Sequence, residues 1–211
     1  MRKIRIALTK GRLEKKACEL FEAVGLDCSE LKNKGRRLIL PVGSDYEAVL
    51  AKAADVITYV EHGVCDIGIV GKDTIAENSH RSFYEIMDLG FGKCRFALAA
   101  KQGSDFFSGY NTKTVATKYP AIARSYFERL GMDVGIIKIE GSVELAPLLG
   151  LADAIVDIVE TGATLKENGL CVVEEIMPVS ARVIVNIASL KLRKNEIEEL
   201  LSDMERAKQL I

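Results

Sequence analysis

The sequence is poor in the residues from which metal sites and disulfide frameworks are built. It has only two histidines, His62 and His80, among 211 residues. Its five cysteines are odd in number, and no two of them are spaced as CxxC. We therefore expect thiols without special chemistry, no disulfide framework and no metal-ligating set of side chains.

An excess of charge of one sign is also missing, as is any long apolar run. Twenty-nine Lys and Arg stand against 30 Asp and Glu, a formal net charge of −1. This balance excludes a basic field that wraps nucleic acid or grips an anionic membrane. Arg5 and Lys10 interrupt the apolar start, unlike a signal peptide, and no run reaches the about 18 residues of a membrane-spanning helix. We expect a cytoplasmic protein that binds neither nucleic acid nor membrane.

What the sequence does have is an alternation of short apolar strands with amphipathic helices. Such alternation predicts an α/β protein with parallel strands covered on both faces. No low-complexity linker interrupts it, so two lobes, if present, are joined by crossing strands, with the ligand in a cleft at the strand ends. Strands are predicted at 4–8, 38–40, 48–50, 66–71, 96–100, 114–117, 136–139, 154–159 and within 170–188, and helical segments at 13–24, 56–60, 119–130, 143–151 and 197–204.

The most informative stretch is the apolar strand 154–159 and the turn that follows it. Gly162 lets the backbone approach a ligand closely, and Thr161 and Thr164 add hydroxyl donors before a predicted helix. Asp157, toward the strand end, suits hydrogen bonds from sugar hydroxyls. These are the pieces of a ribose-5-phosphate site. A plain strand-to-helix turn with a threonine N-cap has the same residues, and both interpretations stay open at this point.

The TGxT pattern resembles the loop that binds the diphosphoribosyl group in phosphoribosyltransferases. That class usually has two adjacent acids, whereas Val156 precedes Asp157 here. A longer series of residues resembles the ATP phosphoribosyltransferase family of histidine biosynthesis. In this part of the chain the series is Glu144, Gly150, Ala152, Ile155, Asp157, Ile158, Thr161, Gly162, Thr164 and Leu165. Elsewhere it is Thr9–Leu13, Thr58–Gly63, Asp66–Asp73, Ala116–Pro120, and Ser180–Arg182 with Asn186.

The resemblance implies a reaction and a set of site residues. The family joins N1 of ATP to C1 of phosphoribosyl diphosphate and releases diphosphate, with Mg²⁺ bound through the substrate phosphates. By similarity, Arg12 and Arg36 are catalytic, and arginine at such a place stabilises charge that develops on the leaving group. The resemblance also implies a substrate-binding set: Lys10, Gly11, Asp157, Thr161, Gly162, Ala163, Thr164 and Leu165.

Each of the cations has an alternative interpretation. Lys10 and Arg12 also suit a solvated helix start, although cations are slightly unfavourable there. Arg36 stands in a short basic run, which is usually a solvated loop, and its neighbour Arg37 is the other candidate for the family position. Lys52 stands where the family often has Arg, and lysine lacks the bidentate phosphate geometry, so we assign it no role.

The resemblance further implies fold and assembly. The expected fold has two lobes with mixed, mostly parallel sheets, similar to type II periplasmic binding proteins, and a ligand cleft between them. Lobe I is expected at 1–90 plus 180–211, and lobe II, with the phosphoribosyl diphosphate loop, at 91–179. The length resembles that of the short form of the family, which has no C-terminal regulatory domain. That form works with a separate regulatory subunit similar to histidyl-tRNA synthetase. A non-catalytic ligand-binding module and a purine or orotate phosphoribosyltransferase are the alternatives.

Overall fold

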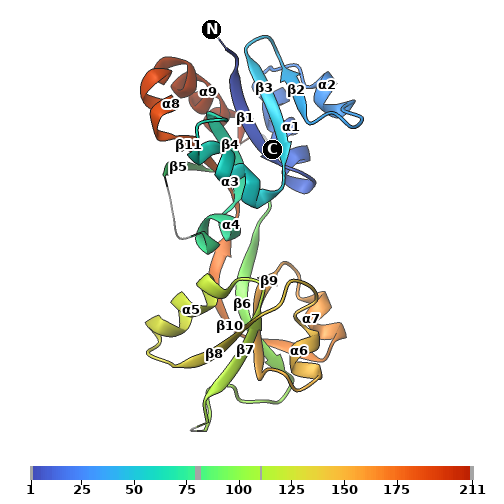
Figure 1. Cartoon of the computed structure of the whole chain (residues 1–211). Helices are drawn as coiled ribbons and strands as arrows, with labels where there is room; N and C mark the ends of the chain where they lie inside the picture. The colour runs from blue at the N-terminus through green and yellow to red at the C-terminus, as the bar shows by residue number, and fades with distance from the viewer. Residues whose placement is uncertain (1, 79–81, 110, 210–211) are drawn as a thin grey trace. The chain divides into compact units, whose positions relative to one another are not determined.

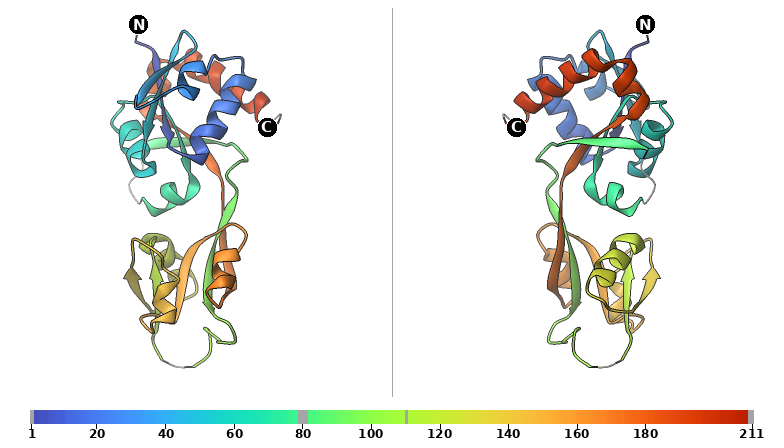
Figure 2. Two further views of the ribbon diagram at one scale, coloured as in Figure 1. Left: turned by 90° about the vertical axis from the view of Figure 1, so that its right-hand side faces the viewer. Right: turned by 90° about the vertical axis from the view of Figure 1, so that its left-hand side faces the viewer.

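The chain folds as two compact units in a computed structural model that describes residues 2–78, 82–109 and 111–209. Unit 1 comprises Met1–Gly92 and Ser180–Ile211, and unit 2 comprises Lys93–Val179. The chain therefore passes into unit 2 once and returns once. The expected lobe limits, 90/91 and 179/180, lie close to these two passages. Figures 1 and 2 show that each unit has a sheet of its own with helices packed on it.

The described part of unit 1 forms a six-stranded sheet in the order β2-β3-β1-β4-β11-β5. β3, β1 and β4 run parallel to one another, and the remaining pairings, β2 with β3, β11 with β4 and β11 with β5, are antiparallel. The strands are β1 (Ile4–Thr9), β2 (Ile39–Val42), β3 (Tyr46–Ala51), β4 (Ile67–Gly71), β5 (Phe83–Asp88) and β11 (Ala181–Asn186). The helices are α1 (Arg12–Ala23), α2 (Ser29–Lys32), α3 (Ala53–Glu61), α4 (Lys72–Glu77), α8 (Ile187–Leu192) and α9 (Lys194–Ala207).

Helices cover both faces of this sheet, because its strands alternate their side chains between two cores. On β1, Ile4, Ile6 and Leu8 pack into one core with α1 and α9, whereas Ala7 packs into the other with α3. The apolar face of the last helix belongs to the first core, so this face is interior packing and not a free surface for a subunit contact. Its residues are Ile197, Leu200, Leu201 and Met204.

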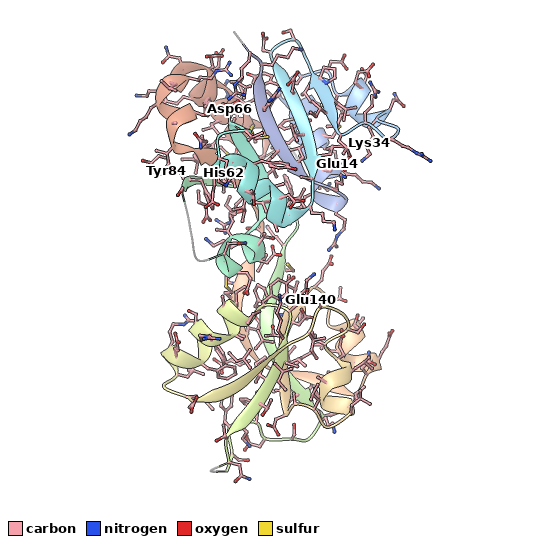
Figure 3. All side chains as sticks on the ribbon, in the orientation of Figure 1. Glu14, Lys34, His62, Asp66, Tyr84 and Glu140 are labelled. Atoms are coloured by element: carbon pink, nitrogen blue, oxygen red, sulfur yellow. The ribbon has the colours of Figure 1, made fainter. Side chains whose placement is uncertain are left out.

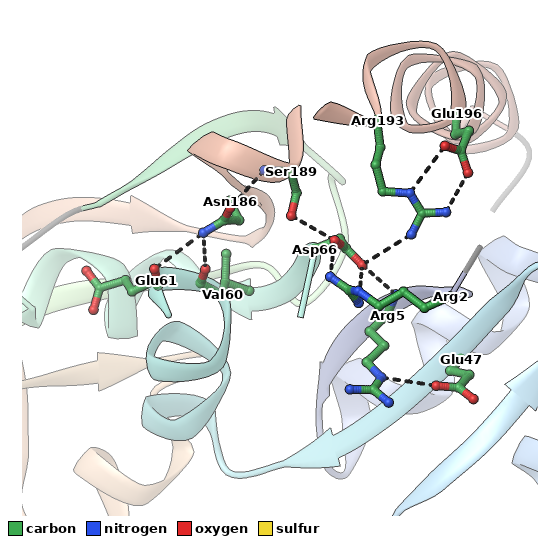
Figure 4. A network of polar contacts seen from close by, with 10 residues as sticks. All are labelled: Arg2, Arg5, Glu47, Val60, Glu61, Asp66, Asn186, Ser189, Arg193 and Glu196. Atoms are coloured by element: carbon green, nitrogen blue, oxygen red, sulfur yellow. Dashed lines mark hydrogen bonds and ion pairs between the residues drawn. The ribbon is translucent and has the colours of Figure 1, made fainter. Parts of the chain in front are cut away.

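A buried carboxylate ties the C-terminal helices to the centre of the sheet. Asp66, just before β4, is fully buried, and Ser189 of α8 donates a hydrogen bond to it at 2.7 Å. The backbone N–H of Arg5 donates to its second oxygen at 2.9 Å. Figure 4 shows the guanidinium groups of Arg2 and Arg193 beside the same carboxylate. A buried charge needs such partners, so this network stabilises unit 1.

Unit 2 forms, within its described residues, a five-stranded sheet in the order β10-β6-β9-β7-β8. β9, β7 and β8 run parallel, whereas β6 is antiparallel to both its neighbours. The strands are β6 (Cys94–Lys101), β7 (Lys113–Thr117), β8 (Val134–Lys138), β9 (Ala154–Val159) and β10 (Leu170–Val179). The helices are α5 (Pro120–Arg129), α6 (Leu145–Leu148) and α7 (Ala163–Glu167).

The helices of unit 2 also lie on both sides of their sheet. α6 and α7 share a core with small residues of β6 and with Ile155 of β9. In Figure 1, α5 lies on the other side, where it buries Tyr126 and Phe127. The Phe106 ring packs on Phe127 with ring centroids 5.9 Å apart. This two-sided burial explains why β9 is apolar except at Asp157.

The predicted strand–helix alternation is confirmed, with several differences in detail, among them the short helices α2 and α4, for which no helix was predicted. Residues 83–88, to which we assigned no element, form the edge strand β5. The helix expected over 143–151 is shorter and comprises only α6. Gly150 has a positive φ of 77°, which ends the helical conformation, and the leucines of this segment are exposed. The β-rich stretch ends at Asn186, because its side chain accepts the Ser189 N–H at 2.9 Å and starts α8.

The sheets are mixed, as predicted, but the expected excess of parallel pairs is wrong. Four strand pairings among the described residues are parallel and five are antiparallel. The antiparallel ones come from the β2–β3 hairpin and from β6, β10 and β11, which carry the chain into and out of unit 2. In the described part of the chain, no helix has the length and apolar character to cross a membrane.

Candidate active site

The parallel strands of unit 1 end along one edge of the sheet, which is where ligands bind in open α/β sheets. Thr9 at the end of β1 pairs with Ala51 at the end of β3. The backbone N–H of Lys10 then donates to the Ala51 carbonyl at 3.0 Å. Lys10 and Lys52, both exposed, therefore start from neighbouring points of this edge. The sequence interpretation assigned no role to Lys52, and only the strand register reveals that it neighbours Lys10.

Gly11 makes the turn from β1 into α1. Its φ of 99° lies in the region that glycine adopts far more readily than other residues. Arg12 is the first residue of α1 and is exposed. A hydrogen bond fixes this start of the helix, because the buried Glu14 carboxylate accepts the Gly11 N–H at 3.3 Å. The predicted residues Lys10, Gly11 and Arg12 thus lie consecutively at the strand edge.

Arg36 lies at the tip of a four-residue turn that follows α2. The Arg37 N–H donates to the Lys34 carbonyl at 3.0 Å and closes the turn. The Arg37 guanidinium lies back on α2, with hydrogen bonds to Glu30 at 2.7 Å and to the Asn33 carbonyl at 3.1 Å. Arg36 is exposed and has no hydrogen bond or ion pair with other described residues. Of the two arginines, Arg36 is therefore the one whose guanidinium has no partner among the described residues.

Other cations near the strand ends of unit 1 are already paired. The Lys72 ammonium, just after β4, lies 2.9 and 2.6 Å from the two carboxylate oxygens of Glu85. Arg182 on β11 lies 2.9 Å from the Asp88 carboxylate. Lys10 and Lys52 have no such ion pair among the described residues. Lys10, Lys52 and Arg36 are therefore cations of this unit without an ion pair among the described residues.

In unit 2, Asp157 is the acidic residue of the otherwise apolar strand β9. It lies between β6 and β7, opposite Ala97 of β6. Burial raises the pKa of the Asp157 carboxyl, and the negative charge of Glu144 acts in the same direction. The Ile158 backbone and the positive charge of Lys118 act against this rise in pKa. A partly desolvated carboxylate is a strong acceptor for hydroxyl groups of a ligand.

The predicted loop follows Asp157 and leads into α7. Gly162, with φ of 81°, is the left-handed residue before the helix. Thr161, Ala163 and Thr164 are exposed, whereas the Leu165 side chain is buried in the core, so only its backbone can face a ligand. The Thr161 hydroxyl accepts the Ala163 N–H at 3.3 Å. The N-cap of α7 is Gly162 and has no side-chain cap hydrogen bond in the described part of the chain, so the threonine N-cap of the alternative interpretation is not formed. Among the described residues, Thr161 makes only this local turn contact, and Thr164 stays exposed.

Sequence reasoning assigned no role to three neighbours of this loop. Lys118 follows β7, the parallel neighbour of β9, and Glu144 precedes α6; both charges act on Asp157. Arg95 on β6 donates to the Glu160 carbonyl at 3.4 Å, and a hollow of about 620 Å³ opens beside it. Lys118 and Glu144 stood within matched family segments, but their proximity to Asp157 depends on strand order.

The described residues contain no group of three or more His, Cys, Asp or Glu side chains that would hold a metal ion by themselves. Mg²⁺ is commonly bound by one or two carboxylates together with substrate phosphates and water. Asp157 and Glu144, which interact electrostatically, match that limited donor set. The residues present therefore fit a cation that arrives with a phosphorylated substrate.

Comparison with known proteins identifies the family. The sequence model of HisG: ATP phosphoribosyltransferase matches residues 52–206. A protein of Clostridium kluyveri named ATP phosphoribosyltransferase is 63% identical over 205 residues, which are 97% of this chain and 93% of that protein. The chain belongs to the ATP phosphoribosyltransferase family. A Clostridium novyi protein of that name is 58% identical and covered to 98% in both chains.

Solved structures agree with this assignment to the ATP phosphoribosyltransferase family. A chain of the ATP phosphoribosyl transferase (HisG:HisZ) complex from Thermotoga maritima has a TM-score of 0.83 and 32% identity, covering 99% of this chain and all of that one. The aliphatic sulphonate binding protein SsuA of Escherichia coli has a TM-score of 0.61 and 13% identity, covering 100% and 74%. That second likeness concerns the fold alone, and it confirms the predicted similarity to periplasmic binding proteins.

Membership of the ATP phosphoribosyltransferase family establishes the class of reaction. The protein is a phosphoribosyltransferase of the first step of histidine biosynthesis. A sugar-phosphate site is therefore required, which favours the phosphate interpretation of the 157–165 loop over a plain turn. The alternatives of a non-catalytic module and of a purine or orotate enzyme are both displaced by the family match.

Proposed function

We propose that unit 2 binds phosphoribosyl diphosphate through Asp157 and the loop 161–165. The observation that carries this is the sequence of features along one strand and turn: a partly buried carboxylate, then a left-handed glycine with exposed threonines on both sides. Asp157 accepts hydrogen bonds from the ribose hydroxyls. The hydroxyls of Thr161 and Thr164 and the backbone N–H of Leu165 donate to the 5-phosphate. Gly162 leaves room for the phosphate, and Ala163, whose own N–H is donated to Thr161, lines it.

We propose that unit 1 supplies the positive charge of the reaction. Two polyanionic substrates need cations, and Lys10, Arg12 and Arg36 are exposed on the same unit. As the bond from C1 to diphosphate breaks, negative charge grows on the leaving group. Arg12 and Arg36 stabilise that charge, and arginine suits this role because its planar fork binds two phosphate oxygens at once. Lys10 holds substrate phosphate, and Gly11, which has no side chain, lets the backbone approach it closely.

The chemical step needs orientation more than base catalysis. N1 of the adenine ring carries a lone pair and is largely unprotonated at neutral pH, so it attacks C1 directly. The new N1–C1 bond forms as the C1–oxygen bond to diphosphate breaks, and no proton needs to be removed first. Asp157 and Glu144 are the carboxylates that would hold a Mg²⁺ ion arriving with the diphosphate, and such an ion would supply neutralisation of charge on the leaving group. Binding both substrates in line therefore supplies most of the acceleration.

We further propose that the chain works as the catalytic subunit of a hetero-oligomer in the cytoplasm. The Thermotoga maritima chain of similar extent is part of a HisG:HisZ complex, which supports a separate regulatory subunit, as the resemblance implied. None of the five cysteines, all of them described, forms a disulfide, which suits a reducing compartment. No role in binding nucleic acid or membrane is proposed.

A turnover assay tests this function. Protein mixed with ATP, phosphoribosyl diphosphate and Mg²⁺ should produce phosphoribosyl-ATP, followed by absorbance, and diphosphate in equal amount. The assay is run with the chain alone and with a HisZ-type regulatory subunit. Binding of both substrates without product in either mixture would instead support a non-catalytic binding module.

A further inference from the structure

Glu14 is a buried carboxylate with two partners from different segments of unit 1. Only 6% of the residue is exposed, although it stands in the first turn of α1. One oxygen accepts the Gly11 N–H at 3.3 Å, and the other accepts a hydrogen bond from the Lys34 ammonium. Figure 3 labels both side chains, which lie at the same corner of the unit. A buried charge is costly without partners, so this arrangement is specific.

The two partners of Glu14 belong to the two segments that carry the proposed catalytic arginines. Gly11 directly precedes Arg12, and Lys34 opens the turn that has Arg36 at its tip. Arg37 fastens the far end of that turn to Glu30, so the turn is held from both sides. Arg36 alone extends from it without a partner among the described residues. Glu14 thus connects the start of α1 with the arginine turn through side-chain and backbone hydrogen bonds.

We propose that Glu14 and Lys34 are a positioning pair that holds Arg12 and Arg36 at a fixed separation for the leaving diphosphate. This inference rests on the proposed roles of the two arginines. Charge stabilisation in a transition state depends on donors that are already in place, and a displacement of about 1 Å can cost about 100-fold in rate. The pair supplies that preorganisation, and its own charges are satisfied by each other.

The decisive experiment is a double-mutant cycle between the pair and Arg36. Lys34→Met removes the ammonium but keeps the length of the side chain. We expect it to lower kcat about 10-fold in the wild-type background, with KM for ATP changed less than about twofold. In the Arg36→Ala background the same substitution should lower kcat less than about twofold, because no arginine remains at the tip to be positioned.

Two further variants separate positioning from folding. Lys34→Met leaves the Glu14 charge buried and unpaired, so Glu14→Gln/Lys34→Met is made as well, which removes both charges. The double variant should melt near the wild-type temperature and still show the loss of kcat. Lys34→Arg keeps a positive charge at this position and should retain most of the wild-type kcat. The control is Lys16→Met, which breaks the exposed 2.6 Å pair with Glu19 on the same helix and should leave kcat unchanged.

The outcomes distinguish this inference from the proposed function. A kcat loss from Lys34→Met that is equally large in the Arg36→Ala background would overturn positioning. Positioning would also be overturned if Lys34→Met had the wild-type kcat while Arg36→Ala had a strongly reduced one. In that case the proposed catalytic role of Arg36 would still stand. An Arg36→Ala enzyme with wild-type kcat would refute the proposed role of Arg36 itself.

Discussion

Arg2, the second residue of the sequence, donates two hydrogen bonds to the carboxylate of Asp66, at 3.0 and 2.8 Å. The two residues are 64 positions apart, and Asp66 is fully buried while Arg2 is about half exposed. The pair joins the segment before β1 to the residue before β4, and these two strands are neighbours in the sheet. With Ser189 on the same carboxylate, three distant segments of unit 1 are fastened at one point (Figure 4).

Asp66→Asn should therefore destabilise unit 1. The amide keeps the size of the side chain but offers one acceptor oxygen, so hydrogen bonds to Arg2, Arg5 or Ser189 are lost in a buried place. We expect a loss of about 2–4 kcal/mol in the free energy of unfolding, measured in urea. Glu47→Gln, which breaks the half-exposed 3.1 Å pair with Arg5, is the control and should cost less than about 1 kcal/mol. Equal effects of the two substitutions would contradict the role of burial.

Arg36 and Arg37 should respond differently to alanine substitution. Arg36→Ala removes the exposed guanidinium at the tip of the turn and should lower kcat by about 100-fold or more, with little change in stability. Arg37→Ala removes the contacts with Glu30 and Asn33, so it should lower kcat less, by about 10-fold at most. Steady-state kinetics of both variants decide which arginine serves the reaction. A larger loss in Arg37→Ala would shift the assignment by one residue.

Asp157→Asn should separate activity from stability. Loss of charged hydrogen bonds worth about 1.5–3 kcal/mol should lower kcat/KM for phosphoribosyl diphosphate by about 10- to 100-fold. Burial raises the pKa of the folded carboxyl above its value in the unfolded chain. As pH rises between these two values, the unfolded chain loses its proton first, so stability falls across this window and then levels off.

The neutral side chain of the Asp157→Asn variant does not titrate, so the stability of the variant and of the wild type should depend differently on pH. Asp157→Asn should be at least as stable as the wild type near pH 7, with a smaller difference near pH 4, in urea unfolding at both values. A variant that loses stability and activity in parallel at pH 7 would indicate that Asp157 is a structural residue of β9.

Gly162→Ala tests the left-handed turn of the phosphoribosyl loop. Alanine at φ of 81° should cost about 1 kcal/mol of stability, and its methyl group should hinder the close approach of phosphate. Gly131→Ala is a matched control in the same unit, since Gly131 has φ of 66° and open space around it. Both variants should lose similar stability, but only Gly162→Ala should raise KM for phosphoribosyl diphosphate. An unchanged KM in Gly162→Ala would argue against phosphate binding at this turn.

Local sequence patterns were enough to predict most of the succession of elements and to suggest a phosphate-binding role for the loop after β9. Local patterns of apolar side chains predict the elements. Examples are the apolar strands 4–8 and 154–159 and the apolar helix face within 197–204. Thr161, Gly162 and Thr164 suggested a phosphate site because backbone freedom and hydroxyl donors are properties of the residues themselves, and this role stays a prediction. The edge strand β5 was missed because its exposed Tyr84 and Ile86 give it no polar–apolar alternation.

Which distant residues act on one another became visible in the folded chain and not before. Strand direction depends on how the chain returns, so the antiparallel majority of pairings was not readable from the strands alone. What each guanidinium contacts favours Arg36 over Arg37 as the arginine of the site, a preference that the sequence could not supply because adjacent arginines have the same chemistry. Lys52 beside Lys10, Lys118 beside Asp157 and Lys34 beside Glu14 arise from strand register and helix packing. Burial and charge pairing act through space, so they become defined only when the chain has folded.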